Sequence, residues 1–249
     1  MLQYLIVCPL IFLAGLVDSI AGGGGLISLP AYLIAGVPAH MAIGTNKLSS
    51  VFGTTVSTVR FMKNGYMKLK LGVMSAVLGL IGSFIGAHLS LLVSERFIKY
   101  LMLIVLPVVA FYVLRHKNIG DHEETGTLPE AKMYAICAAA AFFVGGYDGF
   151  YGPGTGTFLI LIFTGAAKLD IKTANGNAKV VNLASNVAAV TTFIANGTVI
   201  YSLGLAAAVF GILGNYIGSG MVMKNGQKIV RPVILVVLAI LFIKILSGQ

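Results

Sequence analysis

The chain of 249 residues contains little charge: aspartate, glutamate, lysine and arginine make up 10% of it, and only 8 residues are acidic. A soluble domain carries about 25% charged residues, so this chain has too little polar surface to fold in water. Hydrophobic residues make up 57%, and the long apolar runs lack the two-residue alternation of a transmembrane β-barrel. We therefore expect an all-α integral membrane protein.

Cysteine and catalytic motifs are also scarce. The 2 cysteines, Cys8 and Cys137, lie in apolar segments, a pattern that indicates neither a disulfide framework nor a metal site. The sequence contains no P-loop, no Gly-x-Ser-x-Gly motif and no paired His/Glu metal motif. We expect no enzymatic activity, no cofactor and no metal. Any transport would have to use an ion or substrate gradient rather than ATP.

The net charge is +9. In a soluble protein this excess would suggest nucleic-acid binding, but in a membrane protein lysine and arginine gather in cytoplasmic loops. We interpret the charge as a record of topology and expect no nucleic-acid partner.

Ten apolar segments follow one another along the chain. Segments 25–36 and 155–167 are too short to cross about 30 Å of hydrocarbon at about 1.5 Å per residue. Each follows a glycine-rich break, at 22–25 and at 152–156. The sequence therefore predicts about eight full spans and two short segments. The segments are 2–21, 25–36, 42–62, 71–93, 97–114, 133–150, 155–167, 174–195, 199–223 and 229–246.

Two sequence patterns occur twice. Ala-x-Gly-x-x-Lys ends at Lys47 and again at Lys179, 132 residues later, and Asp-x-x-x-Gly-x-Gly begins at Asp18 and again at Asp148, 130 residues later. Self-similarity of this length indicates a duplication whose halves pack about a pseudo-twofold axis. We place an N-terminal repeat at 1–115, a cytoplasmic linker at 116–132 and a C-terminal repeat at 133–249.

Two topologies compete for these repeats. If each glycine-broken pair of segments crosses the membrane once, the halves are parallel and the loop cations divide almost evenly between the two faces. If each pair turns back, the halves are inverted and nearly all loop lysines and arginines lie on one face. The positive-inside rule favours the second arrangement. We expect inverted repeats with both termini outside.

Asp18 and Asp148 lie in the broken segments at equivalent positions, and Lys47 and Lys179 are likewise equivalent. A charged group inside a membrane is costly and is usually paired or functional. One interpretation pairs Asp18 with Lys47, and Asp148 with Lys179, to hold each half together. The other gives the four residues a role in substrate or proton handling, with the aspartates carrying a coupling proton.

The breaks also predict an anion site. A helix that starts after a break has unpaired N–H groups, and its dipole favours a negative charge. Two such ends, at 24–26 and 154–157, would face one another near the midplane. Polar residues downstream share a helix face, at Lys47, Ser50 and Thr54 and again at Lys179, Asn182 and Asn186. The alternative is hydrogen bonding between helices without a substrate. The expected substrate-binding residues are Gly24, Gly25, Thr45, Asn46, Lys47, Ser50, Gly154, Thr155, Gly156, Asn177, Lys179, Asn182 and Asn186.

The second copy, DGFYGPGTGTFL at 148–159 followed by ANGNAKVVNLASN at 174–186, resembles the TauE/SafE sulfite exporter family of membrane permeases. The first half resembles the same family through AGGGGLISLP at 21–30 and AIGTN at 42–46, so the resemblance covers nearly the whole chain. It implies substrates such as sulfite, sulfoacetate and related organosulfonates or carboxylates.

Together these features predict a secondary transporter of a small anion that works by alternating access at a midplane site. The alternative is a passive anion channel, which conducts without exchange. The expected partners are the anion and the lipid bilayer, and a homodimer is left open. Because no organellar signal is present, we expect a multi-pass protein of a prokaryotic plasma membrane.

Overall fold

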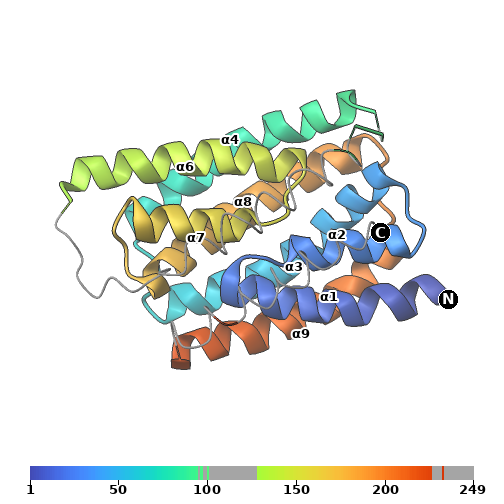
Figure 1. Cartoon of the computed structure of the whole chain (residues 1–249), viewed down its shortest axis with the longest axis horizontal. Helices are drawn as coiled ribbons and strands as arrows, with labels where there is room; N and C mark the ends of the chain where they lie inside the picture. Colours follow the sequence, from blue (N-terminus) through green and yellow to red (C-terminus); the bar gives the residue numbers. More distant parts are fainter. Residues whose placement is uncertain (95, 98–99, 101–127, 226–231, 233–249) are drawn as a thin grey trace.

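The structure is a computed structural model and describes residues 1–94, 96–97, 100, 128–225 and 232 (Figure 1). All but three residues of the predicted segments 97–114 and 229–246, and most of the predicted linker, lie outside these residues. The regular elements of the described part are helical: α1 (Leu2–Ala21), α2 (Gly25–Ile34), α3 (Ala39–Lys63), α4 (Leu69–Leu92), α6 (Glu130–Phe150), α7 (Thr155–Gly165), α8 (Ile171–Ala195) and α9 (Tyr201–Asn225).

The eight helices lie where the apolar segments predict them, with ends that differ by a few residues. The two short segments are confirmed as short helices, of 10 residues in α2 and 11 in α7. Helix α1 ends because Gly22 adopts the left-handed conformation, with φ 74°, and its N–H donates to the carbonyl of Asp18. Gly154, with φ 83°, turns the chain into α7. Glycine adopts this conformation without steric cost, so the breaks follow directly from the sequence.

Five of the described helices, α1, α4, α6, α8 and α9, are long and apolar enough to cross a membrane. Of the about eight predicted full spans, six fall on described residues, so the number in the whole chain stays a prediction; the sixth, 42–62, corresponds to α3. Helix α3 has 25 residues but is more polar than the other long helices. Its polar residues, including Thr45, Lys47 and Ser49, are buried inside the protein.

Helix packing follows the duplication. Helix α1 lies along α9, and its equivalent α6 lies along α4 (Figure 1). Gly214 of α9 meets the carbonyl of Phe12, and its equivalent Gly82 of α4 meets the carbonyl of Phe142. Only a residue without a side chain allows helices to approach this closely. The glycine contacts advance in the same direction on both helices of each pair, so α1 runs parallel to α9 and α4 runs parallel to α6.

Helices α3 and α8 cross at the centre of the molecule in opposite directions. Lys47, early in α3, hydrogen-bonds to Asn186, late in α8, whereas Thr58, late in α3, donates to the carbonyl of Lys179. Helix α4 runs parallel to α8, because Gly79 lies against Val181 and Ser83 donates to the carbonyl of Ser185. The equivalent helices α3 and α8 are therefore antiparallel.

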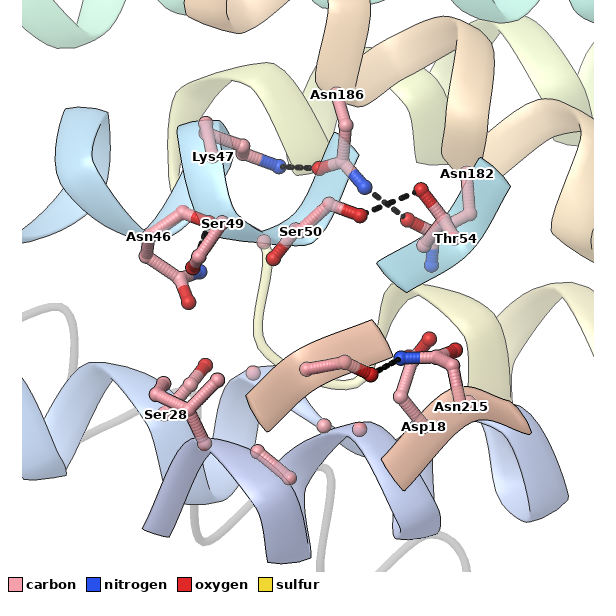
Figure 2. Close-up of a pocket in the computed structure, with 18 of the residues that line it drawn as sticks. Asp18, Ser28, Asn46, Lys47, Ser49, Ser50, Thr54, Asn182, Asn186 and Asn215 are labelled. Atoms are coloured by element: carbon pink, nitrogen blue, oxygen red, sulfur yellow. Dashed lines mark hydrogen bonds between the residues drawn. The ribbon is translucent and has the colours of Figure 1, made fainter. Parts of the chain in front are cut away.

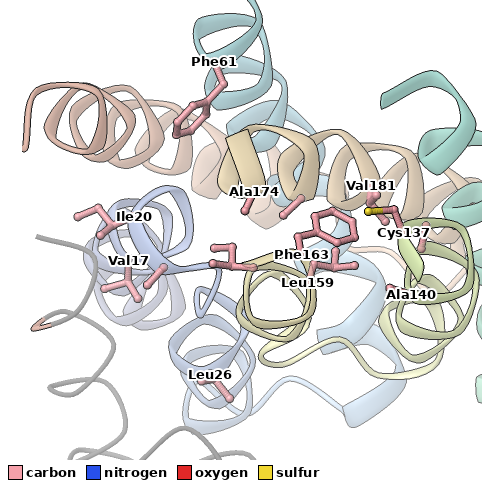
Figure 3. Packing of buried hydrophobic residues seen from close by; sticks show 14 of the residues in the cluster. Val17, Ile20, Leu26, Phe61, Cys137, Ala140, Leu159, Phe163, Ala174 and Val181 are labelled. Carbon is pink, nitrogen blue, oxygen red and sulfur yellow. The ribbon is translucent and has the colours of Figure 1, made fainter. Parts of the chain in front are cut away.

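The short helices lie in the interior. Leu159 and Phe163 of α7 are fully buried in a cluster with residues of α1, α6 and α8 (Figure 3). The outward faces of α4 and α9, in contrast, carry large exposed apolar side chains such as Phe84 and Leu213. A polar interior beneath an apolar outer face suits a protein surrounded by lipid.

Candidate functional site

A cavity of about 50 Å³ lies between α1, α2, α3, α8 and α9, beside the break after α6 (Figure 2). One ordered water needs about 10–15 Å³, so the cavity has room for an anion of a few heavy atoms. Figure 2 shows Asp18, Ser28 and Asn215 on one side, with Lys47, Asn182 and Asn186 on the other. Among the predicted site residues, the cavity brings together Asp18, Gly24, Gly25, Asn46, Lys47, Ser50, Asp148, Asn182 and Asn186.

The ion pairs join the two halves rather than closing within each. Lys47 Nζ lies 2.8 Å from Asp148 Oδ2, and Lys179 Nζ lies 2.8 Å from Asp18 Oδ2. The interpretation that paired Asp18 with Lys47 and Asp148 with Lys179 is therefore wrong. Because α3 and α8 are antiparallel at their crossing, each helix carries its lysine to the break of the other half.

Asp148 is held by three donors. Its Oδ2 accepts from Lys47 and from the hydroxyl of Ser185, and its Oδ1 accepts from the hydroxyl of Thr155 at 2.8 Å. Lys47 also donates to Asn186 Oδ1 at 3.0 Å. The side chains of Lys47 and Asp148 are only 3% and 4% exposed. A charge this deeply buried persists only with such partners, and removing one partner of a buried pair costs about 3–5 kcal/mol.

Asp18 has fewer partners. Lys179 donates both to its Oδ2 and to its backbone carbonyl, and no hydrogen bond from a described residue reaches Oδ1. The Asp18 side chain is 14% exposed, whereas Lys179 is completely buried. Figure 2 places Asp18 next to Asn215 at the edge of the cavity.

The first turn of α2 supplies backbone donors. Gly24 and Gly25 line the cavity, and their N–H groups make no hydrogen bond to another described residue. Two amide oxygens at the cavity, Oδ1 of Asn46 and of Asn215, are buried without a partner among the described residues. Buried polar groups are normally hydrogen-bonded, and an unpaired amide oxygen needs a donor such as a water molecule. The helix dipole adds a positive potential at this end of α2.

The two broken ends meet, as the sequence predicts, but they do not enclose the cavity together. Gly156 packs directly against the backbone of Gly22. This contact fills the space between α1 and the start of α7. Gly154, Thr155 and Gly156 are consequently absent from the cavity lining.

Three further predicted residues also lie outside the lining. The hydroxyl of Thr45 accepts from the N–H of Ile200, and Asn177 donates to the carbonyl of Thr173. Lys179 faces Asp18 rather than the cavity. Thr45 and Lys179 thus join their helices to other segments, whereas the Asn177 bond lies within α8.

The cavity also contains residues outside the predicted set. Asn215 was detectable, because an asparagine in the middle of the apolar segment 199–223 is costly in a membrane. Ser28 and Ser49 stand out only when the repeats are aligned, since their counterparts in the second half are apolar. Ser28, Asn46 and Ser49 correspond to Phe158, Ala178 and Val181. These three polar positions of the first half therefore have apolar counterparts in the second half.

Comparison with known proteins identifies the family. The family model described as Sulfite exporter TauE/SafE matches residues 7–245. "Probable membrane transporter protein ORF9" of Sinorhizobium sp is 34% identical, with 95% of this chain and 89% of that protein covered. "Probable membrane transporter protein YfcA" of Escherichia coli K12 is 34% identical, with coverage of 94% and 86%. A "Probable membrane transporter protein" of Haemophilus influenzae is 30% identical, with coverage of 96% and 92%. No solved structure matches significantly. The chain belongs to the TauE/SafE family of multi-pass membrane transporters.

Proposed function

We propose that the protein is a secondary transporter whose substrate is a small anion of the sulfite or organosulfonate class, bound in the cavity between the two repeats. The observation that carries this proposal is the position of Lys47. Its ammonium group is buried at a cavity that is also lined by Gly24 and Gly25, whose N–H groups bond to no other residue in the described part of the chain. Charge-assisted hydrogen bonds from such groups are among the strongest ways to hold an oxyanion.

The neighbouring side chains complete the set of donors. The amides of Asn46 and Asn182 and the hydroxyl of Ser50 would replace the hydration shell that the anion leaves in water. The small volume favours a compact oxyanion such as sulfite. The sulfonate group of a larger substrate would occupy the same place, with its organic tail directed towards the mouth of the cavity.

Alternating access would come from the arrangement of the repeats. Antiparallel α3 and α8, together with the exchanged ion pairs, support inverted repeats that rock about a shared site. In this arrangement both termini face outward and the linker faces the cytoplasm of a prokaryotic cell. One state of such a cycle requires a cavity that is open on one side of the pseudo-twofold axis and closed on the other. The Gly22–Gly156 contact would provide the closed side.

Counterflow in proteoliposomes tests transport. Vesicles loaded with unlabelled sulfite should take up labelled sulfite transiently and saturably, because a transporter exchanges bound substrate across the membrane. A channel would instead show conductance without exchange, and that result would replace the proposal with the channel alternative.

Thermal unfolding of the purified protein tests the site. Sulfite, sulfate, thiosulfate, methanesulfonate and acetate are compared, since a ligand at 100 times its Kd stabilises the folded state by about 2.7 kcal/mol. The variant Lys47→Gln/Asp148→Asn keeps the local charge balanced and should lose the shift. Lys63→Gln changes an exposed lysine on the same helix and should keep it. Equal shifts in both variants would place the site elsewhere.

A further inference from the structure

We propose that the two intramembrane aspartates have different tasks: Asp18 takes up one proton when the anion binds, and Asp148 is a permanent structural partner of Lys47. This inference rests on the proposed function and specifies how the charge of the substrate is compensated. It separates two residues that the sequence presents as equivalent.

The first argument is the number of donors at each carboxylate. Asp148 accepts from Lys47, Ser185 and Thr155, which occupy both of its oxygens. The residues that correspond to Ser185 and Thr155 in the first half are Gly53 and Gly25, and glycine has no hydroxyl. Asp18 therefore keeps a lysine but lacks both hydroxyl donors.

The second argument is access. Oδ1 of Asp18 receives no hydrogen bond from a described residue, and the side chain lines the cavity. A proton arriving through the cavity can bind there while Lys179 stays on Oδ2. Asp148 lines the cavity as well, but its side chain is only 4% exposed and both of its oxygens already accept hydrogen bonds, so fewer lone pairs are open to a proton there.

The third argument is charge balance. The charged groups around the cavity among the described residues are Lys47, Lys179, Asp18 and Asp148, whose charges cancel. Helices α2 and α9 contribute only the uncharged Ser28 and Asn215 at this place. A bound monoanion leaves one uncompensated negative charge in a poorly solvated interior, which is costly. Protonation of Asp18, the carboxylate of this cavity with an oxygen that accepts no hydrogen bond from a described residue, restores neutrality.

Because the anion and Asp18 would share the cavity, the effect is reciprocal. A nearby negative charge favours the protonated carboxyl, and a protonated carboxyl favours the anion by the same free energy. The step is simple proton binding: the Asp18 carboxylate and one proton form a neutral carboxyl group, and the Lys179 ammonium remains charged.

Proton uptake on anion binding tests this directly. The probe is methanesulfonate, an anion that does not itself titrate near neutral pH, added to purified protein in weak buffer with a pH indicator. Wild type should take up about one proton for each bound anion. Asp18→Asn should bind the anion with a pH-independent affinity and take up none. The conservative variant Asp18→Glu should restore the uptake. Proton uptake that persists in Asp18→Asn overturns the proposal.

Variants at the other carboxylate complete the test. Asp148→Asn should lower thermal stability but keep proton uptake, and Ser185→Ala serves if Asp148→Asn does not fold. Loss of uptake in these variants would contradict the assignment. If wild type binds no anion, the proposed function fails, and pH-difference infrared spectroscopy of the anion-free protein still decides the assignment. The first buried carboxyl signal to appear on acidification should vanish in Asp18→Asn and remain in Asp148→Asn, and the reverse pattern would refute the inference.

Discussion

The two ion pairs are equivalent in the duplicated sequence but differ in their surroundings. Lys47 and Asp148 are both nearly inaccessible, and two hydroxyls support the carboxylate. In the other pair the lysine is the buried member, and Asp18 reaches the cavity with one oxygen that accepts no hydrogen bond from a described residue. Both pairs reach the cavity, one through Lys47 and Asp148 and the other through Asp18 alone, and they differ in the exposure of the carboxylate and in the hydroxyls that support it.

The helical scaffold, in contrast, is alike in both halves. The same glycine positions bring α1 against α9 and α6 against α4, and the equivalent helices α3 and α8 have equal length. The difference lies in a few side chains. Ser28 and Asn46 of the first repeat correspond to Phe158 and Ala178 in the second. The two halves therefore share their packing but differ at these polar positions.

The largest loss of stability is expected when one charge of an ion pair is reversed. Asp148→Lys places a second ammonium group beside Lys47 and should abolish folding, because an unpaired buried charge costs about 3–5 kcal/mol. Lys47→Asp combined with Asp148→Lys should recover folded protein, measured as the yield of monodisperse protein and its unfolding midpoint. Exchange within one half, Lys47→Asp with Asp18→Lys, should give no recovery. Recovery by that second exchange alone would disprove pairing between the halves.

The shared scaffold predicts a matched pair of smaller effects. Gly82→Ala and Gly214→Ala each push a methyl group into a backbone carbonyl, of Phe142 and of Phe12. Such overpacking typically costs about 1–3 kcal/mol, so both variants should lower the unfolding midpoint to a similar extent. Gly165→Ala is the control, because nothing lies within 4 Å of the added methyl group. A strong effect at only one of the two glycines would show that the packing is not equivalent.

Asparagine substitutions test the cavity. Asn46→Ala should weaken anion binding about tenfold, which equals about 1.4 kcal/mol, because it removes a cavity amide whose Nδ2 makes no hydrogen bond to a described residue and can donate to the anion. Asn177→Ala removes an amide that bonds to Thr173 outside the cavity, and its affinity should stay within about twofold of wild type. Titration of both variants by the thermal shift measures the difference. An affinity loss centred on Asn177 would return the site to the second repeat.

The smallest effect is expected at Ser28. Ser28→Ala removes one hydroxyl from the lining and should lower the affinity for the anion only a few-fold, because one hydrogen bond contributes a net of about 0.5–1.5 kcal/mol. Ser75→Ala removes a buried hydroxyl on α4 away from the cavity and should leave the affinity unchanged. If the two variants bind equally well, Ser28 does not contact the anion.

Local features were predictable from the sequence, whereas the pairing was not. Helix lengths and the two breaks depend on hydropathy and on glycines such as Gly22, which act within a few residues. The Lys47–Asp148 contact joins α3 to α6, which are far apart in the chain, so it depends on how the helices pack. Because Asp18 is closer to Lys47 in the sequence than Asp148 is, the sequence favoured Asp18 as the partner of Lys47. The position of the cavity was unpredictable for the same reason. In the sequence Gly154 and Gly156 resemble the glycines of the first break, but in the structure Gly156 packs against Gly22 and leaves no space for a ligand there.

The exchanged ion pairs also bear on how the protein is made. When the first repeat enters the membrane during synthesis, Asp18 and Lys47 still lack the partners that the second repeat provides. Membrane-embedded charges without partners keep a segment unstable, so the early intermediate should be a substrate for quality-control proteases. Either half expressed alone should be degraded, and coexpression of the two halves should protect both. Unaided accumulation of a single half would show that it neutralises its own charges. The cross-pairing thus makes completion of the whole chain a condition for its survival in the cell.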